Sequence, residues 1–310
     1  MRKTSLDMVY ELARRDPRIF FVGSDLGEGT LKQFKAEMPD RFFMEGVSEA
    51  NLIGMAAGLA LEGKIVYANT IATFLTRRCF EQIALDLCLH NVPVRLIANG
   101  GGVVYAPLGP THEAIEDFAI LRALPNMTIV APADAEEMRR FMPTTVDYPG
   151  PIYIRLGKGG DPVLTDPKMP FEIGKAFPLR EGSDAVIVTT GVTLKTALEA
   201  SDTLRGEGIQ AAVLHCPTVK PLDTATLLRY CERATAIVTV EEHSVIGGLG
   251  SAVAEWIAET GFAIPKVFRR LGFPDVFPDQ YGSQDSLLKR YNITPQSICE
   301  IVRKRPRSSK

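Results

Sequence analysis

Short apolar runs alternate with segments of helical periodicity along the first half of the chain. The apolar runs are rich in β-branched residues and nearly continuous, which is typical of strands in a parallel sheet covered on both faces. They lie at 18–22, 64–68, 92–98, 127–130 and 152–155. Helices are expected between them, at 49–62, 75–90, 113–123 and 134–147. This alternation predicts an α/β fold in which residues 1–156 form a doubly wound domain.

A second unit of the same kind follows a stretch without sustained periodicity. Residues 157–182 contain several glycines and prolines, which predicts a linker. Beyond it, strands are expected at 185–189, 210–215, 236–240 and 266–269, and helices at 192–205, 223–231, 249–259 and 295–304. Residues 183–310 are therefore predicted to form a second doubly wound α/β domain.

The composition is that of a globular protein. Of the 310 residues, 45% are hydrophobic and 23% are charged, and the formal net charge is -2. Acidic and basic residues are interleaved, so neither a nucleic acid nor a membrane surface is expected as a partner. The sequence has no apolar run of about 18 residues that could span a bilayer, and its charged N-terminus lacks a signal-peptide pattern. Five cysteines without Cys-x-x-Cys spacing favour reduced core thiols and a cytoplasmic location over disulfides or a zinc site.

The segment 43–60 places a carboxylate, Glu49, at the start of a helix made almost wholly of small and apolar residues. Ser48 is expected to cap this helix, and glycines such as Gly54 and Gly58 allow close packing against another surface. An acid on a tightly packed helix is costly to bury unless it has a function. The alternative is an N-terminal glutamate that is favoured by the helix dipole and partly in water. This segment alone leaves both interpretations open.

Several loops follow predicted strands, where ligands bind in open α/β sheets. They lie at 23–27, 70–78 and 99–112, and a glycine cluster at 247–250 precedes a helix of the second unit. A glycine cluster at a helix start can hold an anion, but the pattern alone is weak. The loop 99–112 is long, largely uncharged and ends in His112, which is unusual for a simple connection.

Motifs in these segments resemble those of the transketolase family. They are Gly46-Val-Ser-Glu-Ala-Asn-Leu-Ile-Gly-Met-Ala-Ala-Gly-Leu-Ala60, Thr73-Phe-Leu-Thr-Arg77, Gly109-Pro-Thr-His-Glu-Ala-Ile-Glu-Asp117, and Arg122-Ala-Leu-Pro-Asn126 with Pro132-Ala-Asp134. The second unit, with Pro217-Thr-Val-Lys-Pro221 and Glu241-Glu-His-Ser-Val-Ile-Gly-Gly-Leu-Gly250, is similar to the C-terminal domain of that family. The resemblance covers residues 3–300. It implies a thiamine-pyrimidine-binding domain followed by a transketolase-type C-terminal domain, an arrangement related to 1-deoxyxylulose-5-phosphate synthases and to the beta subunits of 2-oxoacid dehydrogenases.

The resemblance implies roles for three residues of the first domain. In thiamine diphosphate enzymes of this type, one carboxylate, here Glu49, hydrogen-bonds N1′ of the aminopyrimidine ring and so promotes removal of the proton at C2 of the thiazolium. Phe74 matches the aromatic residue that stacks on the aminopyrimidine. His112 matches the histidine that hydrogen-bonds or shuttles protons at the reacting oxygens. The alternatives are a core phenylalanine and a histidine that caps the following helix.

Three more residues are candidates for binding, each with an open alternative. Arg77 lies in the family's Phe-x-x-Arg context and is expected near cofactor or substrate anions, or else in a surface salt bridge. Arg155 matches the position that binds a substrate phosphate in the sugar-phosphate enzymes, which suits a bidentate guanidinium, and a domain-linking ion pair is the alternative. Asp25, at a strand end, is expected to face the cofactor at the junction with a partner, although a turn-forming aspartate explains it equally well.

The loop before Gly109 departs from ordinary transketolases. Where those enzymes carry an Asp and a His that bind hydroxyls of the donor sugar, this chain has Leu108 and Gly100. Recognition of the donor is thus missing or supplied by other groups, such as Tyr105 or Asn99. An apolar wall at Leu108 fits a less hydroxylated, deoxy or acyl-type donor.

A second departure concerns the metal and the partner. Thiamine diphosphate needs Mg2+ on its diphosphate, which this family binds through a Gly-Asp-Gly motif and a following Asn. The sequence contains no Gly-Asp-Gly, so no residue of this chain is expected to bind the metal. The chain is therefore identified as the C-terminal half of a split enzyme, whose N-terminal subunit carries that motif and shares the cofactor. The expected assembly is a heterotetramer of two plus two subunits (α2β2).

The expected activity is transfer of a two-carbon ketol or acyl unit from a ketose-type donor to an aldehyde acceptor, by a transketolase-like transferase of carbohydrate metabolism. Alternatives are a 2-oxoacid dehydrogenase beta subunit, an acyloin synthase like 1-deoxyxylulose-5-phosphate synthase, and a non-catalytic scaffold. The motifs at 73–77 and 109–112 favour the transketolase and deoxyxylulose branch. The presence of Glu49, Phe74 and His112 argues against a scaffold.

Overall fold

The N-terminal domain is built on a seven-stranded sheet in the computed structural model, which describes residues 1–27, 29–157 and 159–306. Its strands are β1 (Ile19–Gly23), β2 (Phe42–Met44), β3 (Ile65–Ile71), β4 (Val94–Asn99), β5 (Thr128–Val130), β6 (Ile152–Leu156) and β10 (Thr218–Lys220). Their order is β10-β5-β6-β4-β3-β1-β2, and neighbours are parallel except β10, which is antiparallel to β5. The sheet therefore includes one strand from the second half of the chain.

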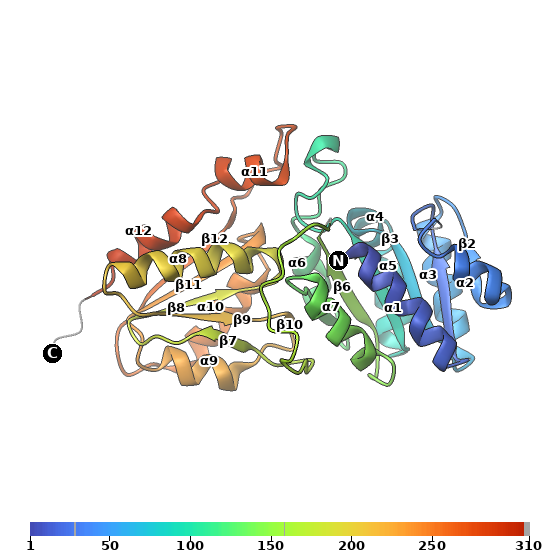
Figure 1. The fold of residues 1–310 in the computed structure, drawn as a ribbon, viewed down its shortest axis with the longest axis horizontal. Coiled ribbons are helices and arrows are strands. Elements are labelled where there is room, and N and C mark those ends of the chain that lie inside the picture. The colour runs from blue at the N-terminus through green and yellow to red at the C-terminus, as the bar shows by residue number, and fades with distance from the viewer. Residues whose placement is uncertain (28, 158, 307–310) are drawn as a thin grey trace.

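Helices cover both faces of this sheet (Figure 1). Alternate residues of β3 face the two sides, with Ile65 and Tyr67 in one hydrophobic cluster and Val66 and Ala68 in another. On the first side lie α1 (Arg2–Arg15), α2 (Lys32–Glu37) and α7 (Ala135–Phe141). On the second side lie α3 (Glu49–Leu61), α4 (Ala72–Arg78), α5 (Phe80–Gln82), a π-helical segment (Ile83–Leu89) and α6 (Asp117–Arg122). This double cover explains why the strands are apolar almost throughout.

The C-terminal domain has a five-stranded sheet with helices on both faces. Its strands are β7 (Phe177–Arg180), β8 (Ala185–Thr189), β9 (Ala211–His215), β11 (Ala236–Ser244) and β12 (Val267–Phe273), in the order β12-β11-β8-β9-β7. Neighbours are parallel except β7, which is antiparallel to β9. The helices α8 (Leu194–Gly206), α11 (Gln284–Arg290) and α12 (Pro295–Arg303) pack on one side, and α9 (Thr224–Cys231) and α10 (Leu249–Thr260) on the other.

The predicted class, two doubly wound α/β domains, is confirmed, but three edge strands are not among the predicted elements, and the first of them is the three-residue strand β2. The strand β7 lies inside the predicted linker 157–182, where Pro178, a residue suited only to an edge strand, interrupts the apolar pattern. The strand β10 is short and pairs across domains, which local patterning does not reveal. The domain bounds 1–156 and 183–310 stay predictions, and residues 158 and 307–310 lie outside the described residues.

Two predicted helices have different bounds in the structure. The helix at 75–90 is divided into α4, α5 and the π-helical segment. The helix α6 begins only at Asp117, because the preceding residues end a loop in which the backbone of Ala114 exchanges hydrogen bonds with that of Gly102. His112 therefore lies within a loop and does not cap this helix, which removes one alternative for that residue.

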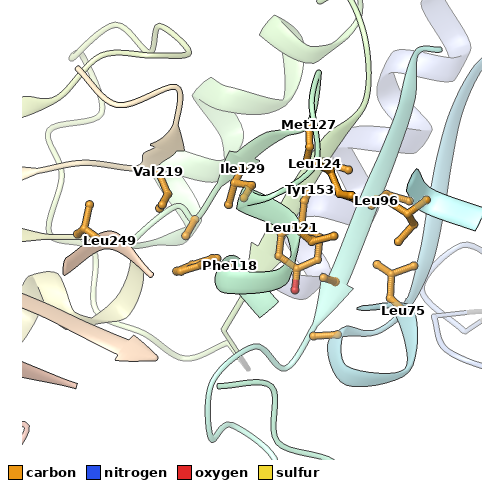
Figure 2. Close-up of a cluster of buried hydrophobic side chains, with 14 of the residues drawn as sticks. Leu75, Leu96, Phe118, Leu121, Leu124, Met127, Ile129, Tyr153, Val219 and Leu249 are labelled. Atoms are coloured by element: carbon orange, nitrogen blue, oxygen red, sulfur yellow. The ribbon is translucent and has the colours of Figure 1, made fainter. Parts of the chain in front are cut away.

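One hydrophobic cluster runs through both domains (Figure 2). In the N-terminal domain it contains Phe118 and Leu121 of α6 and Ile129 of β5, and it continues to Val219 of β10 and Leu249 of α10. All five side chains are almost completely buried. Because burial of such a side chain contributes about 1.5–3 kcal/mol, the two domains stabilise each other through this cluster.

The cysteines belong to the core. All five are free and buried, which confirms the predicted core thiols. Burial raises the pKa of the Cys79 thiol to about 12 and that of Cys88 to about 11, so both stay protonated at neutral pH.

The helices in the described part of the chain are all too short or too polar to cross a membrane.

Replacing Phe118 with alanine should lower the free energy of unfolding by about 3–5 kcal/mol, because a cavity would open in the shared cluster. Trp256, the single tryptophan, lies on α10 of the other domain and packs against the same cluster. Urea unfolding followed by Trp256 fluorescence and by circular dichroism is expected to give one coincident transition that shifts in the variant. A Trp256 transition that stays at the wild-type midpoint would show that the domains unfold independently.

Candidate active site

Glu49 is the first residue of α3, and it is 4% exposed. Its carboxylate oxygen Oε2 accepts a hydrogen bond from Nη1 of Arg78 at 3.0 Å. Ser48 occupies the N-cap position, but its hydroxyl donates to the carbonyl oxygen of Glu45 and not to the helix. The predicted serine cap is therefore wrong, and the carboxylate of Glu49 supplies the negative charge at the positive end of the helix dipole.

The small residues of α3 pack as predicted only in part. Ala56, Ala57 and Ala60 are buried in the hydrophobic cluster. Gly54 and Gly58 are exposed, and among the described residues nothing apart from the helix's own backbone lies within 4 Å of a Cβ built on either. Val47 and Leu61 at the two ends of the helix are 68% and 60% exposed, and Leu89 of the adjacent π-helical segment is 71% exposed. The outward face of α3 is thus apolar and has no cover from the described chain.

Phe74 lies between His112, the other predicted catalytic residue, and the Arg78 side chain that binds Glu49. Its ring centroid lies 5.2 Å from that of His112, with an interplanar angle of 64°. The guanidinium carbon of Arg78 lies 3.9 Å from the centre of the Phe74 ring, and the same guanidinium binds Glu49. The four side chains therefore form one continuous site. Arg78 is not among the predicted residues, although its position one helical turn after Phe74 is a usable signal.

Arg77 binds the loop that carries His112. Its guanidinium forms an ion pair with Glu116 and donates to the carbonyl oxygens of Glu113 at 3.0 Å and Pro110 at 3.4 Å. The structure thus shows the salt bridge that the sequence leaves open as an alternative. Contact of Arg77 with cofactor or substrate anions stays a prediction.

Tyr105 fills the space beside Gly100, where ordinary transketolases are expected to carry a histidine. A Cβ built on Gly100 would lie 2.1 Å from the ring of Tyr105, and the φ angle of Gly100 is +74°. Leu108 ends the short 3-10 helix Ala106–Leu108 and is 49% exposed. Both Tyr105 and Leu108 lie on the loop that leads to His112, and their contact with a donor stays a prediction.

Asn99 and Asp25 lie at the carboxyl ends of strands. Asn99 ends β4 and is buried, and its amide group donates to Oδ1 of Asn69 at 2.8 Å and to the carbonyl oxygen of Thr70 at 2.9 Å. Asp25 follows β1, and its carboxylate accepts a hydrogen bond from the hydroxyl of Ser24 at 3.0 Å. These bonds fix the amide group of Asn99 at the sheet edge, and its predicted contact with the donor stays a prediction. The predicted contact of Asp25 with the cofactor stays a prediction.

Arg155 is enclosed at the junction of the two domains. Its Nε atom lies 2.9 Å from Oδ2 of Asp117, and its Nη2 donates to the carbonyl oxygens of Ala114 and Glu242 at 2.8 Å each. Its guanidinium carbon lies 4.4 Å from the centre of the Phe118 ring. The structure thus shows the domain-linking ion pair that the sequence leaves open. Binding of a substrate phosphate by Arg155 stays a prediction.

Asp117 is the centre of a buried network that the sequence does not single out. Its Oδ2 accepts a hydrogen bond from the hydroxyl of Tyr153 at 2.7 Å. Burial raises the pKa of Asp117, and the charge of Arg155 opposes this rise. His243 is buried nearby with its ring stacked on Phe118 at a centroid distance of 5.2 Å, and burial lowers its pKa. This histidine is therefore neutral at pH 7 and belongs to the packing of the junction.

Two buried glutamates at the same junction have raised pKa values. Burial raises the pKa of Glu242 to about 7, although the charge of Arg155 opposes it. Its Oε1 accepts hydrogen bonds from the backbone N–H of Val103 at 2.9 Å and from the side-chain amide of Gln284 at 2.8 Å. Burial, and then the charge of Glu242, raise the pKa of Glu113 to about 7 as well. Through Glu242 the C-terminal domain holds the glycine-rich loop of the site.

The described residues contain no group of three or more His, Cys, Asp or Glu side chains that could hold a metal ion.

The fold and the site define a pair of α/β domains in which a buried acid, an aromatic face and a histidine converge at one place. The family model "Transketolase, pyrimidine binding domain" matches residues 1–160, and the model "Transketolase, C-terminal domain" matches residues 174–298. The chain therefore belongs to the transketolase family, as its motifs predict.

Relatives of similar length extend this assignment. The chain is 38% identical over 299 residues to a 6-deoxy-6-sulfo-D-fructose transketolase subunit of Clostridium sp. (strain MSTE9), which covers 96% of this chain and 92% of that protein. It is 38% identical over 303 residues to an apulose-4-phosphate transketolase subunit of Phocaeicola vulgatus, which covers 97% of this chain and 96% of that protein. A solved "Split gene transketolase, inactive beta4 tetramer" superposes with a TM-score of 0.87 at 38% identity, over 98% of this chain and 97% of that chain. The prediction of a C-terminal transketolase subunit is confirmed.

Glu242→Gln should change how stability depends on pH. Because the pKa of Glu242 is raised from 4.5 to about 7, the folded wild type binds more protons than the unfolded chain between these values and loses stability as the pH rises through them. Glutamine keeps the acceptor oxygen for Val103 and does not ionise. Melting temperatures at pH 5 and pH 8 are expected to show a gain for the variant that grows with pH, corresponding to a difference on the order of 2–3 kcal/mol. If the gain is the same at pH 5 and pH 8, burial does not raise the pKa of Glu242 in the folded protein.

Proposed function

We propose that the chain is the C-terminal subunit of a two-component, thiamine-diphosphate-dependent transketolase. The enzyme transfers a two-carbon ketol or acyl unit from a ketose-type donor to an aldehyde acceptor. The observation that carries this proposal is the convergence of the buried Glu49, the Phe74 ring and His112 in one site of a chain that belongs to the transketolase family.

The pyrimidine part of thiamine diphosphate fits this site. The space between Glu49 and the face of Phe74 accommodates a flat, nitrogen-bearing group, since the guanidinium of Arg78 lies there at 3.0 Å from the carboxylate and 3.9 Å from the ring centre. An aminopyrimidine is likewise flat, stacks on aromatic faces and offers a ring nitrogen to a carboxyl group. This match in shape, together with a carboxyl group placed to hydrogen-bond a ring nitrogen, supports the cofactor assignment.

Each of the three residues has a distinct task in the proposed reaction. Glu49 holds the proton that is shared with N1′ of the pyrimidine, and its burial prevents water from competing for that proton. Phe74 supports the face of the ring. His112, in contact with Phe74, holds or moves a proton at the oxygens of the donor. The bound cofactor supplies the carbon nucleophile and the electron sink that carry the two-carbon unit.

A partner subunit completes the proposed enzyme. The sequence lacks the Gly-Asp-Gly motif through which this family binds Mg2+, and two relatives are themselves named as transketolase subunits. The outward face of α3, which exposes Val47 and Leu61, has no cover from the described chain. An N-terminal subunit that carries the motif, binds Mg2+, shares the cofactor and packs against this face in an α2β2 heterotetramer accounts for these features. The buried free thiols support a cytoplasmic location. The sugars in the names of two relatives support a role in carbohydrate metabolism.

The proposed donor is less hydroxylated than the ketose phosphates of ordinary transketolases. The positions expected to hold the donor-binding Asp and His are Leu108 and Gly100, and the ring of Tyr105 fills the space beside Gly100. A site without these polar groups leaves donor hydroxyls without partners, which is unfavourable. Two relatives are named for 6-deoxy-6-sulfo-D-fructose and apulose 4-phosphate, which supports an unusual ketose as the donor here.

Glu49→Gln should preserve the fold and lower kcat of the chain reconstituted with its partner by roughly 100- to 10,000-fold, because an amide cannot share its proton with N1′ in this way. Glu62→Gln, which changes an exposed carboxylate at the other end of α3, is the matched control and should keep the wild-type rate. Transfer is measured with thiamine diphosphate and Mg2+, and circular dichroism checks the fold of both variants. A near-normal rate for Glu49→Gln would refute the assignment.

With the reconstituted pair, a deoxyketose phosphate or acyl donor is expected to have a kcat/KM about tenfold or more above those of xylulose 5-phosphate and fructose 6-phosphate. Leu108→Asp places a carboxylate where ordinary transketolases are expected to have one, and it should reduce the difference in kcat/KM between the two classes of donor. Leu228→Asp, at a similarly exposed leucine on α9 of the other domain, should leave it unchanged. The donor class is wrong if xylulose 5-phosphate or fructose 6-phosphate proves the best donor of the wild-type pair.

A further inference from the structure

The Arg78 guanidinium contacts both groups between which the aminopyrimidine is expected to bind, the Glu49 carboxylate and the Phe74 ring. Its Nη1 donates to Oε2 of Glu49 at 3.0 Å, and its guanidinium carbon lies 3.9 Å from the centre of the Phe74 ring. The guanidinium is flat and delocalised, as an aminopyrimidine ring is. Since both groups need the same carboxylate and the same aromatic face, they cannot bind at the same time.

The contact with Arg78 also opposes the proposed task of Glu49. Oε2 of Glu49 accepts its hydrogen bond from Nη1 of Arg78. While the guanidinium holds this carboxylate, the ring nitrogen of a pyrimidine cannot take its place beside Glu49.

The Arg78 side chain has few contacts that would hold it in this position. The side chain is 49% exposed, and its hydrogen bonds and ion pairs among the described residues involve Glu49 alone. Partly exposed ion pairs and cation–π contacts are individually weak. The neighbouring Arg77 differs, because it is fixed by Glu116 and by two carbonyl oxygens of the loop. Of these two arginines, Arg78 is the one that can turn into solvent without disturbing the loop.

We infer that Arg78 is a placeholder, a side chain that closes the pyrimidine site and is displaced when the cofactor ring binds. This inference rests on the proposed function. In the closed form the guanidinium gives the buried Glu49 a partner of opposite charge and covers the face of Phe74. The ring binds only to the open form, so the apparent Kd rises with the fraction of closed molecules.

The test measures binding of an uncharged ring, 4-amino-5-hydroxymethyl-2-methylpyrimidine, to the full chain by ligand-observed NMR titration. Arg78→Ala is expected to lower the Kd of this ring about fivefold or more, because the competing side chain is gone. The uncharged probe separates this competition from any attraction between Arg78 and a diphosphate. Arg139→Ala is the matched control and should bind as the wild type does, since Arg139 lies on α7, is 50% exposed and forms an ion pair with Glu136.

Arg78→Ser is expected to give the same gain as Arg78→Ala, and melting curves establish that each variant is folded. The placeholder is refuted if the folded variants bind the ring no better than the wild type, including the case in which no variant binds it. Glu49→Gln in the reconstituted pair separates this result from the proposed function. If Glu49→Gln abolishes transfer while Arg78→Ala leaves the Kd unchanged, only the placeholder is wrong. If Glu49→Gln leaves transfer intact, the proposed function is wrong whatever the Arg78 variants show.

Discussion

A buried ion pair between Arg155 and Asp117 fixes the junction on which the rest of the molecule depends. Charges enclosed this deeply are costly unless they are paired, and Arg155 also binds the carbonyl oxygens of Ala114 and Glu242. One side chain thereby joins β6, the loop that follows His112, and β11 of the other domain. Because removal of either charge leaves the other unpaired, the shape of the active-site loop and the fit between the domains depend on the same contact.

The C-terminal domain acts on the site through structure, while the candidate catalytic groups all come from the N-terminal domain. Glu242 binds the backbone of Val103, and Gly102 leaves room for it, since a Cβ there would lie 2.3 Å from the Glu242 side chain. The strand β10 extends the N-terminal sheet beside β5, and its Val219 enters the shared cluster. The second domain thus sets the path of the loop that ends in His112, and the first domain presents the acid and the aromatic face to it.

Patterns along the chain predict the elements that are covered on both faces and miss the short edge strands, whose partners lie far away in sequence. Glu49 is recognisable because an acid interrupts a run of small and apolar residues. Arg78 is less distinct, because two adjacent arginines look alike in sequence, and only its spacing of one helical turn marks it as a neighbour of Phe74. For Arg155 the sequence is compatible with an open binding group and with a buried ion pair. Contacts with distant segments decide that question, and they exist only in the folded chain.

The contact between Gly100 and Tyr105 also limits how a lineage with this loop can change over generations. The ring of Tyr105 occupies the volume that the first side-chain carbon of any other residue at position 100 would need, and the backbone of Gly100 has a φ angle of +74°. An imidazole introduced at Gly100 would collide with the ring of Tyr105, so a histidine there requires a shift of that ring or a smaller residue at position 105. Paired substitutions arise far more rarely than single ones. Positions 100 and 105 are therefore expected to change together as this loop evolves.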